Sequence, residues 1–472
     1  AACHYTYMCS EMEKTRLNVV SRKCHLLGAR LLSISNRRIY FLSTFLIHIN
    51  PNQHLKGFDV SLKFKVWERG IGSIFGDEEL EAVKNALETS ETLSGWGPIN
   101  QKFEEEFSKY CGVKHAIAVT SCTAALTLAT RVLRLRKGDE VVCTPQTFIA
   151  TVLEPASRGI TFKFVDIDPN TLNIDPETIE DKITPKTKAI LLVHYGGNPA
   201  DMDPILEIAR SHDLAVIEDA AHAPGAEYKG RKVGSMGDFT CFSFHSLKNM
   251  TTCGEGGMLT TNSDEYDKEA RRLKTMGMVG ETKERTVKTI GKYPKPDPPL
   301  PDHAGGAYDL DWTRIDEYGT NFRLTEVQAA VGLVQLKKLD TFNKMRLEVG
   351  RGYSEGLSEI RGIGVLEDRN DCLNVYHLYP CFLDQKEVSV DHDKFLQYLH
   401  YEKGVQIILR YFPVHLSNYM RYRGHRFGEC PVCERVWFEE QINLPIDPKK
   451  TAEDIDYAVS SIKESISKFG KS

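Results

Sequence analysis

Residues that could do chemistry follow several short apolar runs of this sequence. In VTSCTAALTLA, Ser121, Cys122 and Thr123 come just before a predicted helix. Exposed N–H groups and the positive dipole end of a helix attract anions, and hydroxyl groups add further donors. Ser and Thr also favour the N-cap position without any ligand, so a plain cap is the alternative interpretation. The stretch is therefore a candidate phosphate site.

An aromatic ring and a carboxylate follow two other apolar runs. Phe148 lies just beyond EVVCTP, where its ring could stack on a flat ligand or pack in the core. Asp219 ends the run LAVIED. A buried carboxylate is costly unless a positive group pairs with it, and a protonated ring nitrogen would be such a group. An N-cap or a salt bridge is the alternative, and Glu218 beside it could have that role.

Lys248 lies between an apolar run and a glycine-rich turn in SFHSLKNMTTCGEGG. A lysine in a partly dry, aromatic-rich pocket can lose its proton and attack a carbonyl, whereas most lysines are simply solvated. An anion cradle, a stacking ring, a carboxylate for a pyridinium and a lysine for a Schiff base are the parts that pyridoxal phosphate requires. The sequence therefore predicts that Asp219 keeps the ring nitrogen protonated, while Lys248 bonds the cofactor and moves a proton.

The elements that must position these residues alternate between helical and strand-like patterns from about Val66. Helical stretches such as DEELEAVKNALE are interleaved with runs such as HAIAVT and KAILLVH. This order predicts an α/β fold with a mostly parallel sheet flanked by helices, and ligands at the carboxyl ends of its strands. We predict an N-terminal extension at 1–62, a large cofactor-binding domain at 63–340 and a smaller C-terminal α/β domain at 341–472.

Local composition adds detail to this division. The C-terminal domain is predicted to contain strands near VYHLYPCFL and VQIILRY, and a Pro-rich stretch at 292–306 is predicted to be a loop. The extension is basic and contains the apolar run IYFLSTFLIHI, which is too short to span a bilayer. It is either a targeting segment or an appended stretch without catalytic consequence.

Overall composition excludes some classes of partner. The chain has 472 residues and a formal net charge of -5, and its basic residues form no stripe, so nucleic acid is not expected as a partner. The 12 cysteines show no disulfide spacing, which favours free thiols in a reducing cytoplasm. The sequence thus indicates a cytoplasmic protein with no membrane association.

Residues from about Phe75 to Leu444 resemble the DegT/DnrJ/StrS family of sugar aminotransferases, which have fold type I of the pyridoxal phosphate enzymes. The resemblance rests on several motifs in the right order, among them SCTAALTLA, VIEDAAHAPGA, FSFHSLKNMTTCGEGGM, YGTNFRLTEVQAAVGLVQL and RYFPVH. It implies that Lys248 bonds the cofactor, that Asp219 is the pyridinium partner and that Phe148 stacks on the ring.

The same resemblance implies further contacts with the cofactor. His222 corresponds to the position that contacts the ring hydroxyl, and Ser121, Thr123 and Ser243 to positions near the phosphate. Asn321 corresponds to an asparagine that reaches the phosphate of the neighbouring subunit, which implies a homodimer with a shared active site. The family often has Ser-Gly-Thr where this chain has Cys122 in the middle, so the thiol is expected to point away from the phosphate.

The implied activity is transfer of an amino group from L-glutamate to a keto group, at carbon 3 or 4, of a nucleotide-linked deoxyhexose in amino-sugar biosynthesis. Alternatives are a cyclitol ketone as acceptor, a dehydratase and a regulatory homologue; Lys248 argues against the last two. Arg410, Tyr411 and His415 in RYFPVHL are candidate acceptor contacts or solvated residues. No metal site is expected, because the pair Cys430 and Cys433 supplies only two ligands.

Overall fold

The computed structural model describes residues 64–277, 289–290, 293–294, 318–366 and 368–471. The predicted extension at 1–62 lies outside the described residues. Of the predicted Pro-rich loop only β11 (Tyr293–Pro294) is described, and it pairs with β10 (Thr289–Ile290). Within the described residues no helix is both long and apolar enough to cross a membrane.

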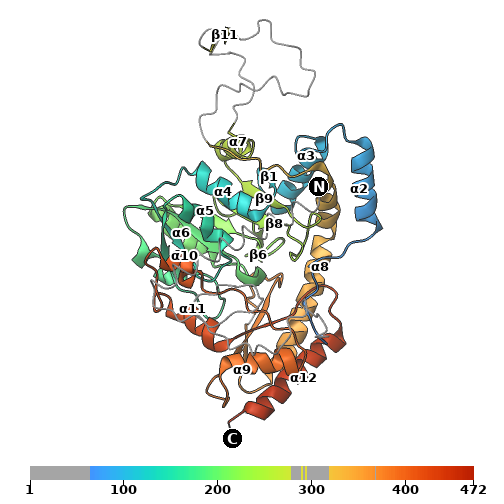
Figure 1. Ribbon diagram of the computed structural model, residues 1–472, viewed down its shortest axis with the longest axis vertical. Helices are drawn as coiled ribbons and strands as arrows, with labels where there is room; N and C mark the ends of the chain where they lie inside the picture. Colours follow the sequence, from blue (N-terminus) through green and yellow to red (C-terminus); the bar gives the residue numbers. More distant parts are fainter. Residues whose placement is uncertain (1–63, 278–288, 291–292, 295–317, 367, 472) are drawn as a thin grey trace, which may run out of the picture. The chain divides into compact units, whose positions relative to one another are not determined.

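A seven-stranded sheet lies at the centre of the part predicted as the large domain, and it confirms the predicted α/β class (Figure 1). Its order is β1-β9-β8-β5-β4-β2-β3, and only β9 runs antiparallel to its neighbours. Each strand coincides with an apolar run that the sequence predicts as a strand. The strands are β1 (His115–Val119), β2 (Glu140–Cys143), β3 (Thr161–Phe164), β4 (Thr187–Val193), β5 (Ala215–Asp219), β8 (Phe239–Ser243) and β9 (Gly257–Thr261).

Both faces of this sheet are covered, which explains why its strands are apolar throughout rather than alternating. Successive side chains point to opposite faces. Val141 and Cys143 pack in the core on one face, and Val142 between them packs in the core on the other. Helices on the first face are α4 (Cys122–Val132), α5 (Ala150–Ser157) and α7 (Asp264–Leu273); those on the second are α3 (Pro98–Cys111), α6 (Met202–Ser211) and α8 (Glu326–Ser358).

The C-terminal part has a hydrophobic core of its own around a three-stranded antiparallel sheet. Its elements are β12 (Ile363–Val365), β14 (Tyr379–Leu383), β15 (Gln441–Leu444), α9 (His392–Gln397) and α12 (Ala452–Phe469). The long helix α8 packs on α2 (Asp77–Thr89) and α3 and reaches α12 (Figure 1). The predicted domain boundary at 340–341 therefore falls inside a continuous helix, and the division into domains stays a prediction.

The run VQIILRY, predicted as a strand, forms no ladder. Val405 makes an isolated bridge with Val66, and the residues from Gln406 to Tyr411 belong to no strand. The reason is that side chains compete for the backbone of this run: the Arg410 N–H donates to the Asn443 side chain at 3.0 Å. That strand prediction is wrong.

Shorter elements connect these layers. They are β6 (Glu227–Tyr228), β7 (Arg231–Lys232), β13 (Cys372–Leu373), α10 (Asn418–Arg421), α11 (Pro431–Arg435) and the single turns η1 (Pro176–Thr178), η2 (Glu180–Lys182), η3 (Tyr195–Gly197), η4 (Tyr398–Glu402), η5 (Val414–Leu416) and η6 (Val436–Glu440).

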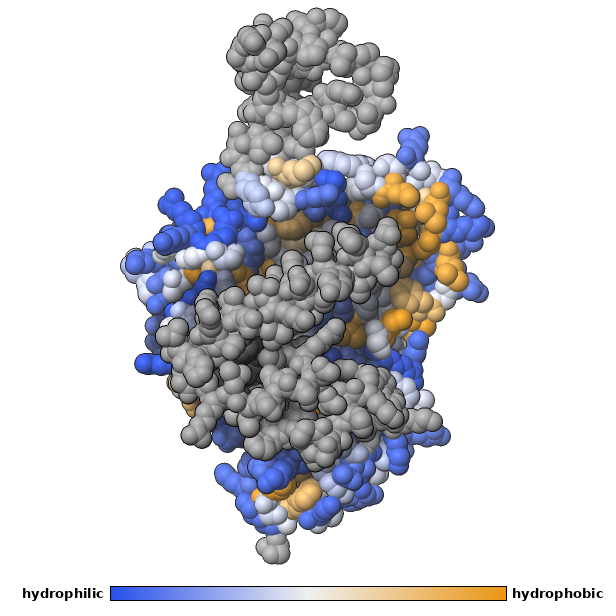
Figure 2. Space-filling view, in the orientation of Figure 1, coloured by the Kyte–Doolittle hydropathy of each residue, from blue (hydrophilic) through white to orange (hydrophobic). Residues whose placement is uncertain are grey.

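Apolar side chains gather on the surface over α2 (Figure 2). Leu80 and Leu87 of this helix are 70% and 57% exposed, and Trp96, just before α3, is 54% exposed. Single exposed apolar residues are common, whereas a group of them on one face is a candidate contact surface.

The start of α4 packs against the backbone of β9 so closely that only glycine fits at Gly257. A methyl group added there would lie 2.4 Å from the carbonyl carbon of Ser121. We expect Gly257→Ala to lower the free energy of unfolding by about 1–3 kcal/mol through overpacking. Urea denaturation measures this. Gly70→Ala is the matched control, because nothing lies within 4 Å of an added methyl group; equal effects of the two substitutions would contradict the argument.

Candidate active site

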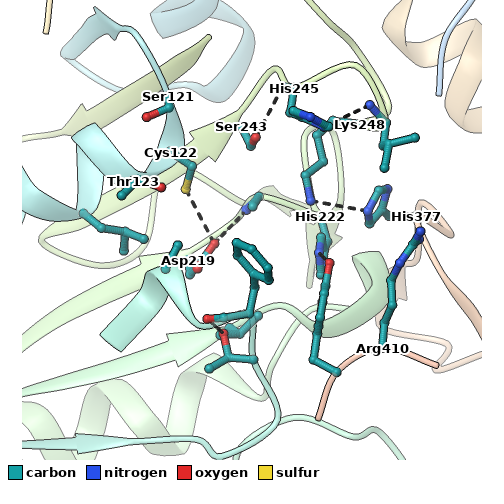
Figure 3. A pocket seen from close by; sticks show the side chains of 18 of the residues that line it. Ser121, Cys122, Thr123, Asp219, His222, Ser243, His245, Lys248, His377 and Arg410 are labelled. Atoms are coloured by element: carbon teal, nitrogen blue, oxygen red, sulfur yellow. Dashed lines mark hydrogen bonds between the residues drawn. The ribbon is translucent and has the colours of Figure 1, made fainter. Parts of the chain in front are cut away.

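A cavity of about 460 Å³ lies where β1, β2, β5 and β8 end, a volume typical of small-molecule sites (Figure 3). Ten of the twelve predicted site residues line it: Ser121, Cys122, Thr123, Phe148, Asp219, His222, Ser243, Lys248, Arg410 and Tyr411. The structure thus brings together residues that lie almost three hundred positions apart in the chain.

One side of the cavity is formed by the beginning of α4. The Ser121 side chain caps this helix by accepting a hydrogen bond from the Ala124 N–H at 3.2 Å. The N–H groups of Cys122 and Thr123 precede the first bond within the helix, so they have no acceptor in it. The Ser243 hydroxyl, at the end of β8, lies on the same side of the cavity (Figure 3). Capping and anion binding are therefore compatible here.

Asp219 is the last residue of β5 and is only 5% exposed. Its Oδ2 accepts a hydrogen bond from the Thr151 hydroxyl at 2.7 Å, and its Oδ1 accepts one from the Ala221 N–H at 3.1 Å. The Cys122 thiol also faces Oδ1, with a sulfur–oxygen distance of 3.7 Å. Among the described residues no cation forms an ion pair with this carboxylate. It keeps acceptor capacity for a protonated nitrogen in the cavity.

Glu218 points to the opposite face of the sheet and has a structural role. Its carboxylate pairs with His194 Nε2 at 2.8 Å and accepts hydrogen bonds from the Gly237 N–H and the Thr240 hydroxyl, both at 2.7 Å. Adjacent residues of a strand face opposite sides. The two neighbouring carboxylates therefore have separate environments.

Lys248 projects into the cavity from the turn between β8 and β9. Its Nζ lies 3.4 Å from Nε2 of His377. Burial lowers the pKa of Lys248 to about 8, and the negative charge of Asp219 opposes this shift. The Asn249 amide donates to the Val375 carbonyl at 2.9 Å, which directs its Oδ1 to His377 Nδ1 at 3.2 Å. The network therefore assigns the proton to Nδ1, and Nε2 offers its lone pair to the amine.

A stack of rings forms the wall beside Lys248. His222 stacks between His377 and Tyr411, with ring centroids 4.4 Å and 5.5 Å away. Its Nδ1 accepts from the Gly196 N–H at 3.3 Å, so its Nε2 donates to the Tyr411 hydroxyl at 3.1 Å. Burial, followed by the charge of Lys248, lowers the pKa of His222 well below its ordinary value. The Phe148 ring, 55% exposed, continues the wall.

Two predicted residues lie outside this cavity. His415 is fully buried in η5, and its Nε2 pairs with Glu434 at 2.8 Å. The prediction that it meets the acceptor is therefore not supported by its position within the chain. Asn321 is exposed and bridges to Thr275, so it lies where another molecule can reach it but does not line the cavity.

The sequence reasoning missed three residues that this geometry brings to the site: Thr151, His377 and Glu68, which pairs with Arg410. Thr151 ends the stretch PQTFIAT, one helical turn after Thr147, to which it is hydrogen-bonded at 2.6 Å. The spacing of these two threonines, one helical turn apart, could have pointed to Thr151 in the sequence. His377 and Glu68 belong to no chemical motif: His377 reaches the cavity through packing of the C-terminal part, and Glu68 reaches Arg410 from residues 64–74.

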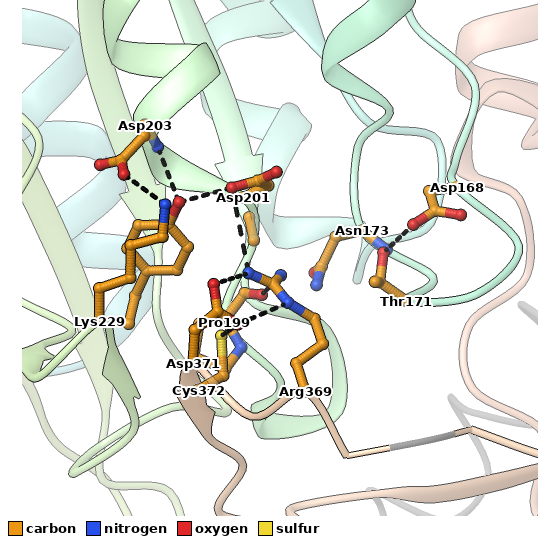
Figure 4. A network of polar contacts seen from close by, with 12 residues as sticks. Asp168, Thr171, Asn173, Pro199, Asp201, Asp203, Lys229, Arg369, Asp371 and Cys372 are labelled. Atoms are coloured by element: carbon orange, nitrogen blue, oxygen red, sulfur yellow. Dashed lines mark hydrogen bonds and ion pairs between the residues drawn. The ribbon is translucent and has the colours of Figure 1, made fainter.

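A second cavity of about 1020 Å³ is lined mostly by acidic and other polar residues. Arg369 pairs there with Asp371 at 3.2 Å and reaches the Pro199 carbonyl, and nearby Lys229 pairs with Asp203 at 2.7 Å (Figure 4). Arg369 thereby joins the loop before β13 to the segment just before α6, and Lys229 joins the β6–β7 turn to the start of α6. We regard the network as a structural link between α6 and the segment before β13.

The described residues contain no cluster of three or more His, Cys, Asp or Glu side chains arranged to hold a metal ion. Cys430 and Cys433 are buried in the core beside α5, and the Cys433 thiol donates to the Gln146 side chain at 3.1 Å.

The chemistry of the first cavity fits the parts of pyridoxal phosphate. N–H groups and hydroxyls suit the phosphate, the carboxylate of Asp219 suits the ring nitrogen, and the exposed ring of Phe148 suits the flat face of the cofactor. Lys248 offers an amine with a lowered pKa. The residues present therefore fit the cofactor.

The sequence model of the DegT/DnrJ/EryC1/StrS aminotransferase family matches residues 74–463. The spore coat polysaccharide biosynthesis protein SpsC of Bacillus subtilis is 36% identical, over 83% of this chain and 95% of SpsC. The crystal structure of S. venezuelae DesV is 31% identical with a TM-score of 0.70, over 83% of this chain and 94% of DesV. Spr1654 of Streptococcus pneumoniae, solved in its PLP form, is 26% identical with a TM-score of 0.73, and the match covers 86% of this chain and 98% of Spr1654.

The lowered pKa of Lys248 gives a direct test of the site. In cofactor-free protein, acetylation of Lys248 by acetic anhydride should reach half its maximal rate near pH 8, because burial disfavours the ammonium form. Asp219→Asn should move this midpoint lower, since it removes a nearby negative charge. Peptide mass spectrometry over a pH series measures both. A midpoint near 10.5, the ordinary value, would contradict the described environment.

Proposed function

Because the chain belongs to the DegT/DnrJ/EryC1/StrS aminotransferase family, we propose that it transfers an amino group from L-glutamate to a keto group of a nucleotide-linked hexose. The enzyme is a pyridoxal phosphate-dependent aminotransferase of a sugar aminotransferase family. The observation that carries the proposal is the single cavity in which Lys248 and Asp219 lie beside the N-terminus of α4. We place the reaction in the cytoplasm, as the sequence predicts.

Pyridoxal phosphate, when bound, withdraws electrons from the reacting carbon of the amino acid and carries the amino group between two substrates. In the proposal, the N–H groups of Cys122 and Thr123, with the Ser121 and Ser243 hydroxyls, bind the phosphate. Asp219 holds a proton on the ring nitrogen, since its carboxylate has spare acceptor capacity.

The remaining residues position the cofactor and move protons. Phe148 stacks on the ring and His222 contacts the ring hydroxyl. Lys248 Nζ takes the proton from the reacting carbon of the donor and later delivers a proton to that of the product. His377 Nε2 accepts one N–H of this amine, which turns the nitrogen lone pair towards the cavity. Arg410 and Tyr411 contact the substrates.

We further propose a homodimer in which Asn321 completes the site of the partner subunit. The residue is exposed and absent from its own cavity, so its amide is available to a neighbouring molecule. The apolar surface over α2, with Leu80 and Leu87, supplies area for a contact between subunits (Figure 2). Each active site would then need two chains.

The central prediction concerns Lys248. Purified protein with pyridoxal phosphate should show a visible absorption band that L-glutamate bleaches, and Lys248→Ala should lose this band and all turnover, because the amine that bonds the cofactor is gone. Absorbance spectra before and after L-glutamate measure this. Lys394→Ala, at an exposed position of α9 outside the cavity, is the control and should behave as wild type. A Lys248→Ala enzyme that keeps half of the wild-type activity would disprove the role assigned to Lys248.

The shared site predicts complementation between two inactive variants. Lys248→Ala and Asn321→Ala should each be nearly inactive alone, but co-expression should restore about a quarter of wild-type activity, because half of the dimers then contain one intact site. Turnover of the unfractionated mixture measures this, and mixed dimers isolated through two different tags should reach about half of wild-type activity, because each contains one intact site of two. Failure of every mixed dimer to turn over substrate would exclude the role proposed for Asn321.

A further inference from the structure

Arg410 is held by a carboxylate of its own chain. Its Nη1 and Nη2 donate to the two carboxylate oxygens of Glu68 at 3.0 Å and 2.7 Å. The two side chains are 14% and 15% exposed, so the pair is largely shielded from water. This two-pronged arrangement is the strongest geometry between an arginine and a carboxylate.

The pair lies at the border of the active-site cavity. Arg410 lines both that cavity and a small adjoining one, and Glu68 lines the adjoining one. His377, which contacts Lys248, also lines both. The guanidinium therefore lies between the substrate space on one side and Glu68 on the other. No other arginine lines the active-site cavity within the described residues.

The backbone on each side of the pair is fixed independently of the ion pair. The Arg410 N–H donates to Asn443, and its carbonyl accepts from the Gln441 side chain at 2.6 Å. The Glu68 N–H donates to the Gln406 side chain at 2.8 Å. The ion pair is therefore not needed to place either residue, and its two side chains can separate without displacing the chain.

We propose that Glu68 is an internal competitor for Arg410, which it releases when a substrate carboxylate enters the cavity. The proposal deepens the proposed function and rests on it. The planar guanidinium already accepts a carboxylate in the two-pronged geometry, so a carboxylate of the amino donor can take the same place. The group that occupies this place in the free chain is itself a carboxylate, so we assign the place to the carboxylate of the donor rather than to a phosphate of the acceptor.

This competition suits an enzyme that admits two different substrates to one cavity in turn. An unpaired arginine would retain the dicarboxylate product of the first half-reaction and leave a cation facing an uncharged sugar ring in the second. With Glu68 in place, the charge of Arg410 is neutralised whenever no substrate carboxylate is bound. Glu68 therefore weakens dicarboxylate binding and promotes product release.

Succinate tests this, because it is a dicarboxylate with neither an amino nor a keto group. Isothermal titration calorimetry of the holoenzyme should show that Glu68→Gln binds succinate more tightly than wild type, on the order of tenfold. Glu68→Asp keeps the charge but shortens the reach, and should give a smaller gain. In the double variant Glu68→Gln/Arg410→Gln the gain should vanish.

Glu387→Gln is the matched control, because it breaks another arginine–glutamate pair, with Arg361, away from the cavity. It should leave succinate binding unchanged. Unchanged or weaker succinate binding in both Glu68 variants would overturn the proposal and make the pair a structural clamp. A gain for inorganic phosphate but not for succinate would overturn the carboxylate assignment.

Two different measurements test the role of Glu68 and the amino-transfer activity. Bleaching of the wild-type absorption band by L-glutamate tests amino transfer without reference to Glu68. A bleached band together with unchanged succinate affinity in the Glu68 variants would reject the inference alone.

Discussion

A carboxylate buried at the end of a parallel strand is the constraint on which the site depends. Asp219 has lost nearly all contact with water, yet its partners among the described residues are a hydroxyl, a backbone N–H and a thiol. Neutral donors orient a carboxylate but do not neutralise it, so its charge favours a cation in the cavity. The start of α4, at the same edge of the sheet, has the opposite polarity. A ligand with a protonated ring nitrogen at one end and an anionic group at the other complements both, and the parallel strands fix the separation of these two features.

Most residues in the part of the site around Asp219 and the start of α4 could be predicted from sequence, because they lie at the end of a strand or shortly after it. Ser121, Phe148, Asp219 and Ser243 all lie at or within a few positions of strand ends, and each strand is an apolar run bounded by polar residues. In a parallel sheet such ends converge whatever the details of packing. Lys248 belongs to the same group, since it lies five positions after Ser243, the last residue of β8. Family resemblance then supplied the roles, whereas physical reasoning alone left a helix cap and a core phenylalanine as alternatives.

The part of the site that contains His377 and Glu68 could not be predicted from local sequence. His377 and Glu68 come from segments that approach the site only through tertiary packing, and no chemical motif in their flanking residues marks them as site residues. His415 shows the converse: it stands four positions after Tyr411 in one motif, but η5 places its ring in the core, where its Nε2 is hydrogen-bonded to Glu434. In VQIILRY the β-branched residues suggested a strand, and only the Asn443 side chain, which binds the Arg410 N–H, shows why no ladder forms.

The part of the site that contains His377 and Glu68 depends on the long helix α8 rather than on the sheet. Arg346 of α8 is fully buried, and burial lowers its pKa to about 10, so it stays charged at neutral pH. Its guanidinium donates to the Gly72 carbonyl at 2.6 Å, to the Tyr376 carbonyl at 3.2 Å and to the Ile446 carbonyl at 3.3 Å. One cation thus joins the segment that carries Glu68, the residue before His377 and the end of β15. Gly72 in turn packs against the Leu247 carbonyl so closely that a methyl group there would lie 2.2 Å from its oxygen. The turn with Lys248 is therefore also held by the segment that Arg346 anchors, and α8 helps to set the position of the amine relative to His377 and Arg410.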